Sequence, residues 1–340
     1  MLLATTLVAM FACTKDDNNK PDTETPDNTP ISYAFTGPKI SKIYMEGTYT
    51  RRYTDNYRPD ETSSTPRHLY LEFLWDGDKL SELRYYDNDG NVSQDTRFFY
   101  DDDKPVRVDN YRGDTLTSYV LYSYTDGRIT SFSNYIGDQL KLNQKYELSY
   151  DSGNRVTRMV VRGYLYDKSA DASEQALMCV FRDRNLAKTL AAHGKAKSTE
   201  EYTTINTLEY TGNNVSRIVW ASEDGEGECV ETLSYDTHAN PFHGVWCMLN
   251  SSQYLVFNEN NCVSMNATES YNENGVRVVN TVGTITGSYT YDSSGRVLSE
   301  NAVYTAGPYH ECEILTEEPY VVEYEYTEIS NTTQYFEYAE

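Results

Sequence analysis

Positive charge is scarce in this sequence. Its 340 residues include 29 Lys and Arg against 52 Asp and Glu, which gives a formal net charge of −23. A chain with this balance repels phosphate backbones and anionic headgroups, and no basic patch stands out along the sequence. These features argue against nucleic acid as a partner.

Catalytic signatures are missing as well. The sequence contains no G-x-S-x-G, P-loop or H-E-x-x-H motif, and a glycosidase pair cannot be chosen among so many carboxylates without geometry. His238, His243 and Cys247 are residue types that bind zinc. Without a second cysteine or a metal-like pair spacing, however, we expect polar loop residues there. We predict no catalytic residue, metal or cofactor.

One acidic stretch resembles a calcium loop. Residues 87–95, DNDGNVSQD, carry acidic or amide side chains at alternate positions. In an EF-hand the glycine is the sixth residue of the loop, whereas Gly90 is the fourth when Asp87 is counted first. We therefore expect hairpin turns here and at residues 101–103.

Aliphatic residues are also few. Hydrophobic residues make up 39% of the chain, yet 13% is aromatic and tyrosine alone numbers 32. Tyrosine buries a large ring and leaves a hydroxyl for solvent or for a hydrogen bond. The composition predicts broad sheets with shallow, partly wet faces and not a thick helical core.

The first residues, MLLATTLVAMFAC, form an apolar run too short for a bilayer-spanning helix of ~20 residues. The run resembles the end of a bacterial lipoprotein signal, in which a small residue precedes the lipid-modified cysteine, here Cys13. It departs from that pattern in having no Lys or Arg before the run and Met10 where Leu is usual. An ordinary secretory signal is the alternative.

A polar segment follows the cysteine. Residues 14–33 are rich in Asp, Asn, Thr and Pro, which predicts a disordered acidic tether. Lys15-Asp16-Asp17 resembles the export tag of Bacteroidetes surface lipoproteins. We predict a signal peptide over 1–13, a tether over 14–33 and one β-meander domain over 34–340. The protein would then be lipid-anchored in the outer membrane and surface-exposed, with its anchor as its only membrane contact.

The remaining cysteines do not define a disulfide framework. Once Cys13 is set aside, their number is odd, and their spacing indicates no pairing. Isolated thiols are the favoured interpretation. These cysteines are Cys179, Cys229, Cys247, Cys262 and Cys312.

A short unit recurs along the chain. It consists of an aromatic residue, two to four turn residues, a polar or basic residue and then an apolar one, and it repeats at steps of 22 to 40 residues. Phe181 is a degenerate copy, with a short helix near 186–193 as the alternative. The ten aromatic residues are Phe35, Trp75, Tyr100, Tyr124, Tyr150, Phe181, Tyr210, Tyr235, Phe257 and Tyr291.

The unit predicts a β-hairpin. Before the turn, Tyr146, Leu148 and Tyr150 alternate with polar residues, which places the apolar side chains on one face of a strand. Asp, Asn, Ser and Gly favour the tight reversal that follows. Ten units predict an all-β, antiparallel up-and-down meander of roughly 20 strands. A sheet of that length is expected to curl strongly or to close into a barrel-like shell.

The apolar residues after each turn have an odd spacing. Leu80 and Leu83 are three apart, as are four similar pairs, so a flat strand would place them on opposite faces. We predict either a recurring β-bulge that turns both inward or a strand start covered on both sides. The other pairs are Ile40/Ile43, Ile129/Phe132, Val156/Met159 and Val215/Ile218.

The units YDSSGRV and YTDGRI resemble the YD repeats of RHS-type proteins, which build large β-shells. Those shells are much longer and carry a proteolytic motif that is missing from this sequence. Together with the lipoprotein start, the chain more closely resembles Bacteroidetes lipoproteins of unknown function with a porin-like β fold. This resemblance implies an architecture and no chemistry. A membrane-spanning barrel is the competing interpretation, but charges interrupt the aromatic faces.

Three functional hypotheses remain open. The leading one is a non-enzymatic surface protein that binds or scaffolds a glycan or a protein partner. The alternative is a polysaccharide-processing hydrolase or accessory protein with a carboxylate site in a groove. The third is a barrel that encloses an apolar ligand. Interior geometry distinguishes them.

Overall fold

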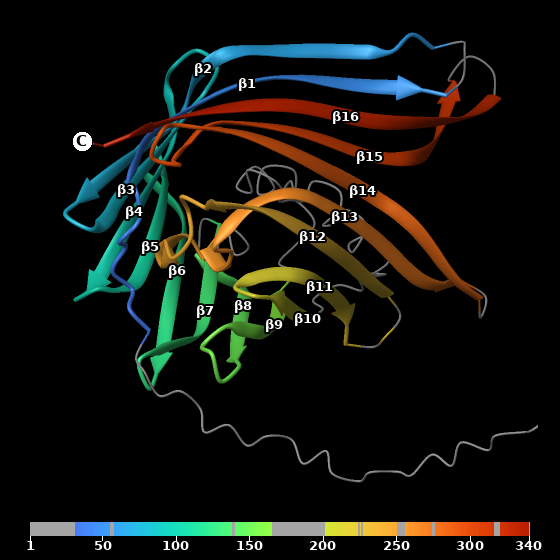
Figure 1. The fold of residues 1–340 in the computed structure, drawn as a ribbon. Helices are drawn as coiled ribbons and strands as arrows, with labels where there is room; N and C mark the ends of the chain where they lie inside the picture. Colours follow the sequence, from blue (N-terminus) through green and yellow to red (C-terminus); the bar gives the residue numbers. More distant parts are fainter. Residues whose placement is uncertain are drawn as a thin grey trace, which may run out of the picture.

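The computed structural model describes residues 31–54, 58–137, 140–164, 201–223, 225, 227–249, 256–273, 276–315 and 320–339. Within these ranges, sixteen antiparallel strands form a closed barrel in which each strand pairs with its sequence neighbours and β1 pairs with β16 (Figure 1). The elements are β1 (Ile40–Tyr53), β2 (Glu61–Asp76), β3 (Lys79–Tyr86), β4 (Val92–Asp101), β5 (Lys104–Arg112), β6 (Thr115–Thr125), β7 (Arg128–Ile136), β8 (Lys141–Tyr150), β9 (Val156–Tyr164), β10 (Glu201–Thr211), β11 (Asn214–Ser222), β12 (Gly227–Ala239), the 3-10 helix η2 (Trp246–Met248), β13 (Asn260–Glu273), β14 (Val276–Tyr291), β15 (Val297–Leu315) and β16 (Tyr320–Tyr338).

The predicted all-β meander, closed into a barrel, is confirmed. The barrel has sixteen strands where the repeat count predicted roughly 20, because not every aromatic unit forms its own hairpin. Phe35 precedes β1, Tyr235 lies in β12, and Phe257 lies in the single long connection between β12 and β13. Phe181 lies outside the described residues, and β9 pairs directly with β10.

The barrel has two unlike ends. The turn end carries the connections that leave β2, β4, β6, β8, β10, β12 and β14, and the distal end carries the others. Strands β3 to β11 have 8 to 11 residues, whereas β15 and β16 have 19 each. At ~3.3 Å per residue, the longest strands form a taller wall on one side (Figure 1). No helix in the described part of the chain has the length and hydrophobicity of a membrane-spanning segment.

The predicted bulge recurs at the turn end. In the β2–β3 pair, Trp75 lies opposite Leu80 but Leu74 lies opposite Glu82, so Ser81 is the extra residue. The bulge turns both Leu80 and Leu83 inward, where they are 1% and 2% exposed. The same register shift lies beside Tyr100, Tyr124, Tyr150, Tyr210, Tyr235 and Tyr291.

The bulge residue is often a Ser or Thr. Ser81 Oγ donates a hydrogen bond to the Leu74 carbonyl oxygen at 2.8 Å, and Ser216 Oγ donates to the Glu209 carbonyl at 3.3 Å. This hydrogen bond links the two strands at the point where the bulge distorts their backbone pairing. The sequence analysis missed this signal, a hydroxyl residue directly after the apolar one. Thr130 and Thr157 make similar bonds at the turn end, and Ser93 and Thr117 make them at bulges near the distal end.

The turn aromatics link neighbouring hairpins. Tyr100 Oη donates to the Leu80 carbonyl at 2.8 Å, and Tyr150 Oη donates to the Ile129 carbonyl at 2.7 Å. In each case the acceptor is the first apolar residue after the preceding turn. We call this series the aromatic ladder. Its other donors are Trp75, Tyr124, Tyr210, Tyr235 and Tyr338, with distances of 2.6 to 3.0 Å.

Two segments outside the strands fill the turn end. Residues 31–39 and the β12–β13 connection place side chains against the apolar residues that follow the turns. The Ile129 backbone N–H donates to Tyr33 Oη at 3.0 Å, and Phe35 stacks on Trp75 with ring centroids 5.1 Å apart. The buried side chains of this plug are Tyr33, Phe35, Val245, Cys247, Met248, Leu249, Val256 and Phe257.

Tyr150→Phe tests the aromatic ladder. The variant keeps the ring but leaves the Ile129 carbonyl without its donor, so we expect a loss of ~1–3 kcal/mol in the free energy of unfolding. Urea unfolding should show a lower midpoint with an unchanged m-value. Tyr119→Phe, on the outer wall, is the control. An equal loss in both variants would contradict a special role for the ladder.

Candidate functional site

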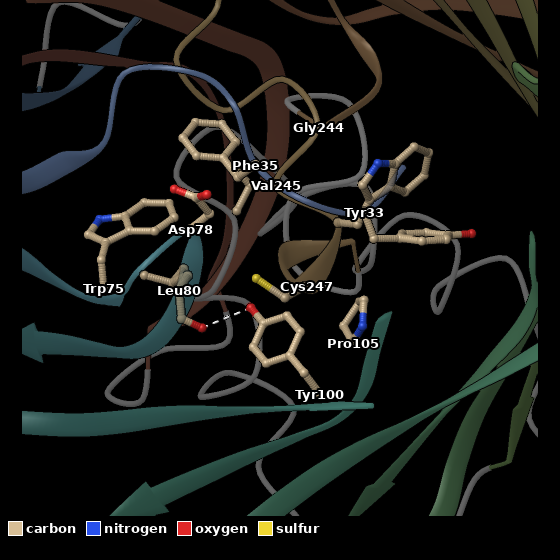
Figure 2. A pocket seen from close by; sticks show the side chains of 11 residues that line it. Tyr33, Phe35, Trp75, Asp78, Leu80, Tyr100, Pro105, Gly244, Val245 and Cys247 are labelled. Carbon is tan, nitrogen blue, oxygen red and sulfur yellow. Dashed lines mark hydrogen bonds between the residues drawn. The ribbon is translucent and has the colours of Figure 1, made fainter. Parts of the chain in front are cut away.

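The crevice at the turn end belongs to the core. It lies between the plug and the barrel wall and has room for roughly one water molecule (Figure 2). Burial raises the pKa of Cys247 to about 12, so the thiol stays protonated and is a poor nucleophile. The Tyr122 hydroxyl donates to the Cys247 carbonyl at 3.0 Å, which fixes the plug to β6. The crevice therefore has a structural role.

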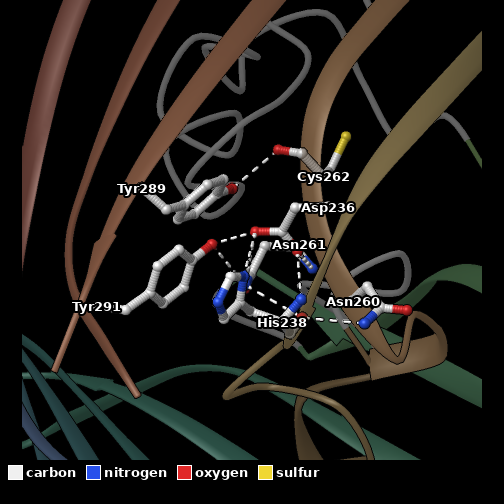
Figure 3. Close-up of polar contacts among 7 residues, drawn as sticks. All are labelled: Asp236, His238, Asn260, Asn261, Cys262, Tyr289 and Tyr291. Carbon is white, nitrogen blue, oxygen red and sulfur yellow. Dashed lines mark hydrogen bonds and ion pairs between the residues drawn. The ribbon is translucent and has the colours of Figure 1, made fainter. Parts of the chain in front are cut away.

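A polar network surrounds Asp236 near the same end (Figure 3). Its carboxylate accepts hydrogen bonds from Tyr291 Oη and from Asn261 Nδ2, and the His238 ring stacks on Tyr291 at 3.7 Å. Burial, together with the hydrogen bond to Asp236, raises the pKa of Tyr291, which keeps the phenol a donor. Tyr289, not Tyr291, reaches the Cys262 carbonyl, at 2.9 Å. The network thus anchors the β14–β15 hairpin, in which Tyr289 makes the hydrogen bond of the aromatic ladder in place of Tyr291.

Glu300 is a buried acid beside this network. It is 6% exposed and lies on the inner wall, opposite Tyr289 on one side and Gln334 on the other. Tyr289 Oη donates to Glu300 Oε1 at 2.6 Å. Burial nevertheless raises the pKa of Glu300 to about 7, because the charged form loses its hydration.

Two of the metal and calcium candidates, His238 and Asp87, make structural contacts, whereas the His243 side chain is exposed. His238 stacks within the Asp236 network, and the described residues contain no group of three metal-ligating side chains. Asp87 Oδ1 accepts from the backbone N–H groups of Asp89 at 3.0 Å and Asn91 at 2.8 Å. These hydrogen bonds lower the pKa of Asp87. The hairpin-turn interpretation of residues 87–95 is confirmed.

A group of aromatic and charged residues lies on the inner wall toward the distal end. The β1–β16 register runs without a shift from Lys42 to Tyr53, so every second residue from Ile43 onward faces inward. We call this group the distal cluster, and it lies beyond the apolar core. It consists of Tyr49, Arg51, Tyr53, Tyr304, Tyr309, Tyr326 and Glu328.

Glu328 and Tyr326 organise the distal cluster. Tyr49 Oη donates to Glu328 Oε1 at 2.6 Å, and Arg51 Nη2 donates to the same oxygen at 3.3 Å. The Arg51 guanidinium also lies 4.5 Å from the centroid of the Tyr326 ring. Burial and the Glu328 carboxylate raise the pKa of Tyr49 to about 12. Tyr309 packs on Tyr326 with ring centroids 5.2 Å apart.

The distal cluster is accessible to solvent, whereas the turn end is filled by the core. The Arg51 and Glu328 side chains are 29% and 19% exposed, and four of the five tyrosines are half-buried. The cluster thus offers ring faces, a fixed cation and a fixed carboxylate to a polar ligand. These are stacking and charge-assisted hydrogen-bonding groups. We take it as the candidate functional site.

None of the described turn aromatics lies in the distal cluster. Trp75, Tyr100, Tyr124, Tyr150, Tyr210, Tyr235 and Tyr291 pack at the turn end, and Phe35 and Phe257 belong to the plug. Cys13 and Phe181 lie outside the described residues. The sequence analysis did not find the cluster. Its local signal is limited to Tyr49, Arg51 and Tyr53 at alternate positions of β1.

Comparisons with known proteins concern the fold. No protein-family model and no curated protein matches the sequence. Among solved structures, the chain is similar to a porin-like protein from Bacteroides uniformis ATCC 8492, with a TM-score of 0.39 and 12% identity over 91% of this chain and 100% of that one. A porin-like protein from Bacteroides vulgatus ATCC 8482 has a TM-score of 0.27 and 9% identity over 89% and 99%. TcdB2-TccC3-TEV has a TM-score of 0.28 and 9% identity, and the match covers 71% of this chain and 13% of that chain. The barrel assignment itself comes from the strand pairing of this chain.

Glu300→Gln tests the effect of the buried acid on stability. The folded-state pKa, about 7, lies above the ordinary value of 4.5. Its stabilising contribution is therefore complete below pH 4.5 and lost as the pH rises to 7, a change of ~3 kcal/mol. Glutamine keeps an acceptor for Tyr289 without titrating. We expect the variant to gain stability relative to the parent across this window, measured by urea unfolding. The exposed Glu337→Gln is the control, and a constant difference between Glu300→Gln and the parent would contradict the expectation.

Proposed function

We propose that this protein is a lipid-anchored, non-enzymatic binding module of the cell surface, with the distal cluster as its site and carbohydrate as its ligand class. The observation that carries the proposal is the gathering of five tyrosines, Arg51 and Glu328 on one accessible inner wall. The outer membrane is the proposed location, residues 1–13 are the proposed signal and residues 14–30 the proposed tether. The tether ends earlier than the sequence predicted, because Tyr33 is buried in the plug.

Carbohydrate fits the chemistry of the cluster. A sugar ring has an apolar C–H face that packs on an aromatic ring, and its edge carries hydroxyls that donate and accept hydrogen bonds. Arg51 Nε is buried and has no hydrogen-bond partner in the part of the chain that the structure describes. The side chain as a whole is 29% exposed, and its other guanidinium nitrogens are donors for a ligand hydroxyl.

Binding is favoured over hydrolysis by the surroundings of Glu328 and Glu300 on the inner wall. A glycosidase needs one carboxylic acid and one carboxylate on either side of its substrate. Glu328 accepts hydrogen bonds from Tyr49 and Arg51 through one oxygen, so this carboxyl group is already engaged by the protein. Glu300 has the raised pKa of an acid, but it is buried and bonded to Tyr289 nearer the turn end.

The outer wall supports an aqueous setting for the barrel. Outward-facing Arg107 pairs with Asp109 at 2.6 Å, and Glu147 pairs with both Lys145 and Arg162. A Lys or Arg on the lipid face of a barrel costs ~2–4 kcal/mol at the bilayer midplane. Several such residues on one wall favour a barrel held at the membrane by an anchor.

Tyr309→Ala and Arg51→Ala test the binding proposal. Each removes a stacking face or a donor, and we expect at least about a tenfold rise in Kd, ~1.4 kcal/mol, for an oligosaccharide selected on a glycan array. Tyr335→Ala, on the outer side of β16, is the matched control. Titration calorimetry measures all three. A silent array, or binding that the cluster variants leave unchanged, would sink the proposal.

Cys13→Ala tests the anchor. If Cys13 carries the lipid, the variant should lose incorporation of labelled palmitate and should leave the detergent phase in Triton X-114 partitioning. A Cys262→Ala variant should keep both. Cleavage of the wild-type protein by external protease on intact cells tests the surface location. Retained label in Cys13→Ala would refute the lipid assignment.

A further inference from the structure

The outer wall carries a row of side chains that are far apart in the sequence and lie side by side only in the folded barrel. Successive register partners join Phe99 on β4, Arg107 on β5, Leu121 on β6 and Ser133 on β7, and then continue to β8 and β9. Neighbouring strands lie ~4.8 Å apart, so the row is about 24 Å long. We call it the cationic row. Its members are Phe99, Arg107, Leu121, Ser133, Lys145 and Arg162.

The cationic row faces outward. Phe98, Val108 and Val120, which alternate with it along their strands, are at most 7% exposed and lie in the core. Phe99 and Leu121 are 43% and 36% exposed. Both belong to the few large hydrophobic side chains that are exposed within the described ranges, and they flank Arg107.

The row is positively charged on a chain of net charge −23. It contains three cations and no acid. The carboxylates that pair with them lie in adjacent rows: Asp109 is almost fully buried next to Arg107, and Glu147 bridges Lys145 and Arg162 at 2.9 and 2.6 Å. The Arg107 side chain remains 40% exposed. Three cations thus face two carboxylates, of which Asp109 is recessed and Glu147 is shared between two cations and as exposed as they are.

Within the cationic row, contacts with neighbouring aromatic rings already hold Arg107 in place. Arg107 lies 4.6 Å from the centroid of the Tyr119 ring, and Tyr119 stacks on Tyr135 with centroids 4.6 Å apart. Holding a long side chain in one geometry reduces the entropy lost on binding. Arginine beside exposed aromatic and apolar side chains is typical of the residues that dominate protein interfaces.

We propose that the cationic row is a docking surface for an acidic polypeptide segment that also carries apolar side chains. Charge complementarity selects an acidic partner, and exposed Phe99 and Leu121 favour a polypeptide over a polyuronate, which has no aliphatic side chains to bury. Two copies of this chain would oppose like charges if they met through the same face. The row lies on the outer wall, so this proposal is independent of the distal cluster.

The test uses the full chain and three fluorescent probes. These are a synthetic peptide of alternating Glu and Leu, a poly-Glu peptide of equal length and polygalacturonate, each titrated by anisotropy. We expect the Glu-Leu peptide to bind best, and its affinity to fall roughly tenfold between low and high salt. Tighter binding of polygalacturonate, or equal binding of both peptides, would overturn the partner class.

Charge reversal locates the binding surface. Arg107→Glu should weaken the Glu-Leu peptide by roughly tenfold, and Lys145→Glu, at a second position in the row, should weaken it in the same direction. Arg217→Glu is the matched control, because Arg217 also forms an ion pair on the outer wall, with Glu209. Thermal melting confirms that each variant folds. Equal weakening in the control, or none in either row variant, would refute the proposal.

Discussion

The aromatic ladder is the interaction on which the rest of the structure depends. Six of the turn aromatics donate a hydrogen bond to the backbone of the preceding unit, as Tyr100 does to Leu80 and Tyr150 does to Ile129. Because donor and acceptor occupy the same place in successive units, the hairpins keep one spacing around the barrel. At the starts of β3, β7, β9 and β11 the bulge then turns two apolar side chains inward. The plug packs on the ring that results.

This arrangement gives the barrel interior an apolar turn end and a polar distal end. Apolar strand starts and the plug fill the turn end. The crevice and the Cys247 thiol are therefore parts of the core, and the polar network around Asp236 lies beside it. Toward the distal end the inner wall becomes polar, and the long strands β15 and β16 carry it furthest. The two sites proposed for recognition therefore lie on the distal inner wall and on the outer wall.

Local pattern predicted the hairpins and, from the spacing of Leu80 and Leu83, the bulge. It overcounted strands because an aromatic residue followed by turn residues also suits a plug, as Phe35 and Phe257 show. It found no basic patch, because Arg107, Lys145 and Arg162 are far apart along the chain and meet only through strand register. The sequence pattern did not reveal the distal cluster for the same reason.

The sequence by itself determined the net charge, the repeating hairpin unit and the alternation that gives each strand an inner and an outer face. These properties act over a few residues, where turn chemistry and the two-residue period of a strand decide the outcome. Only the tertiary structure decided the closure of β1 onto β16, which brings Tyr49 to Glu328 across 279 residues. No local period encodes that pairing. It follows from the twist of the whole sheet and from the removal of its two exposed edges.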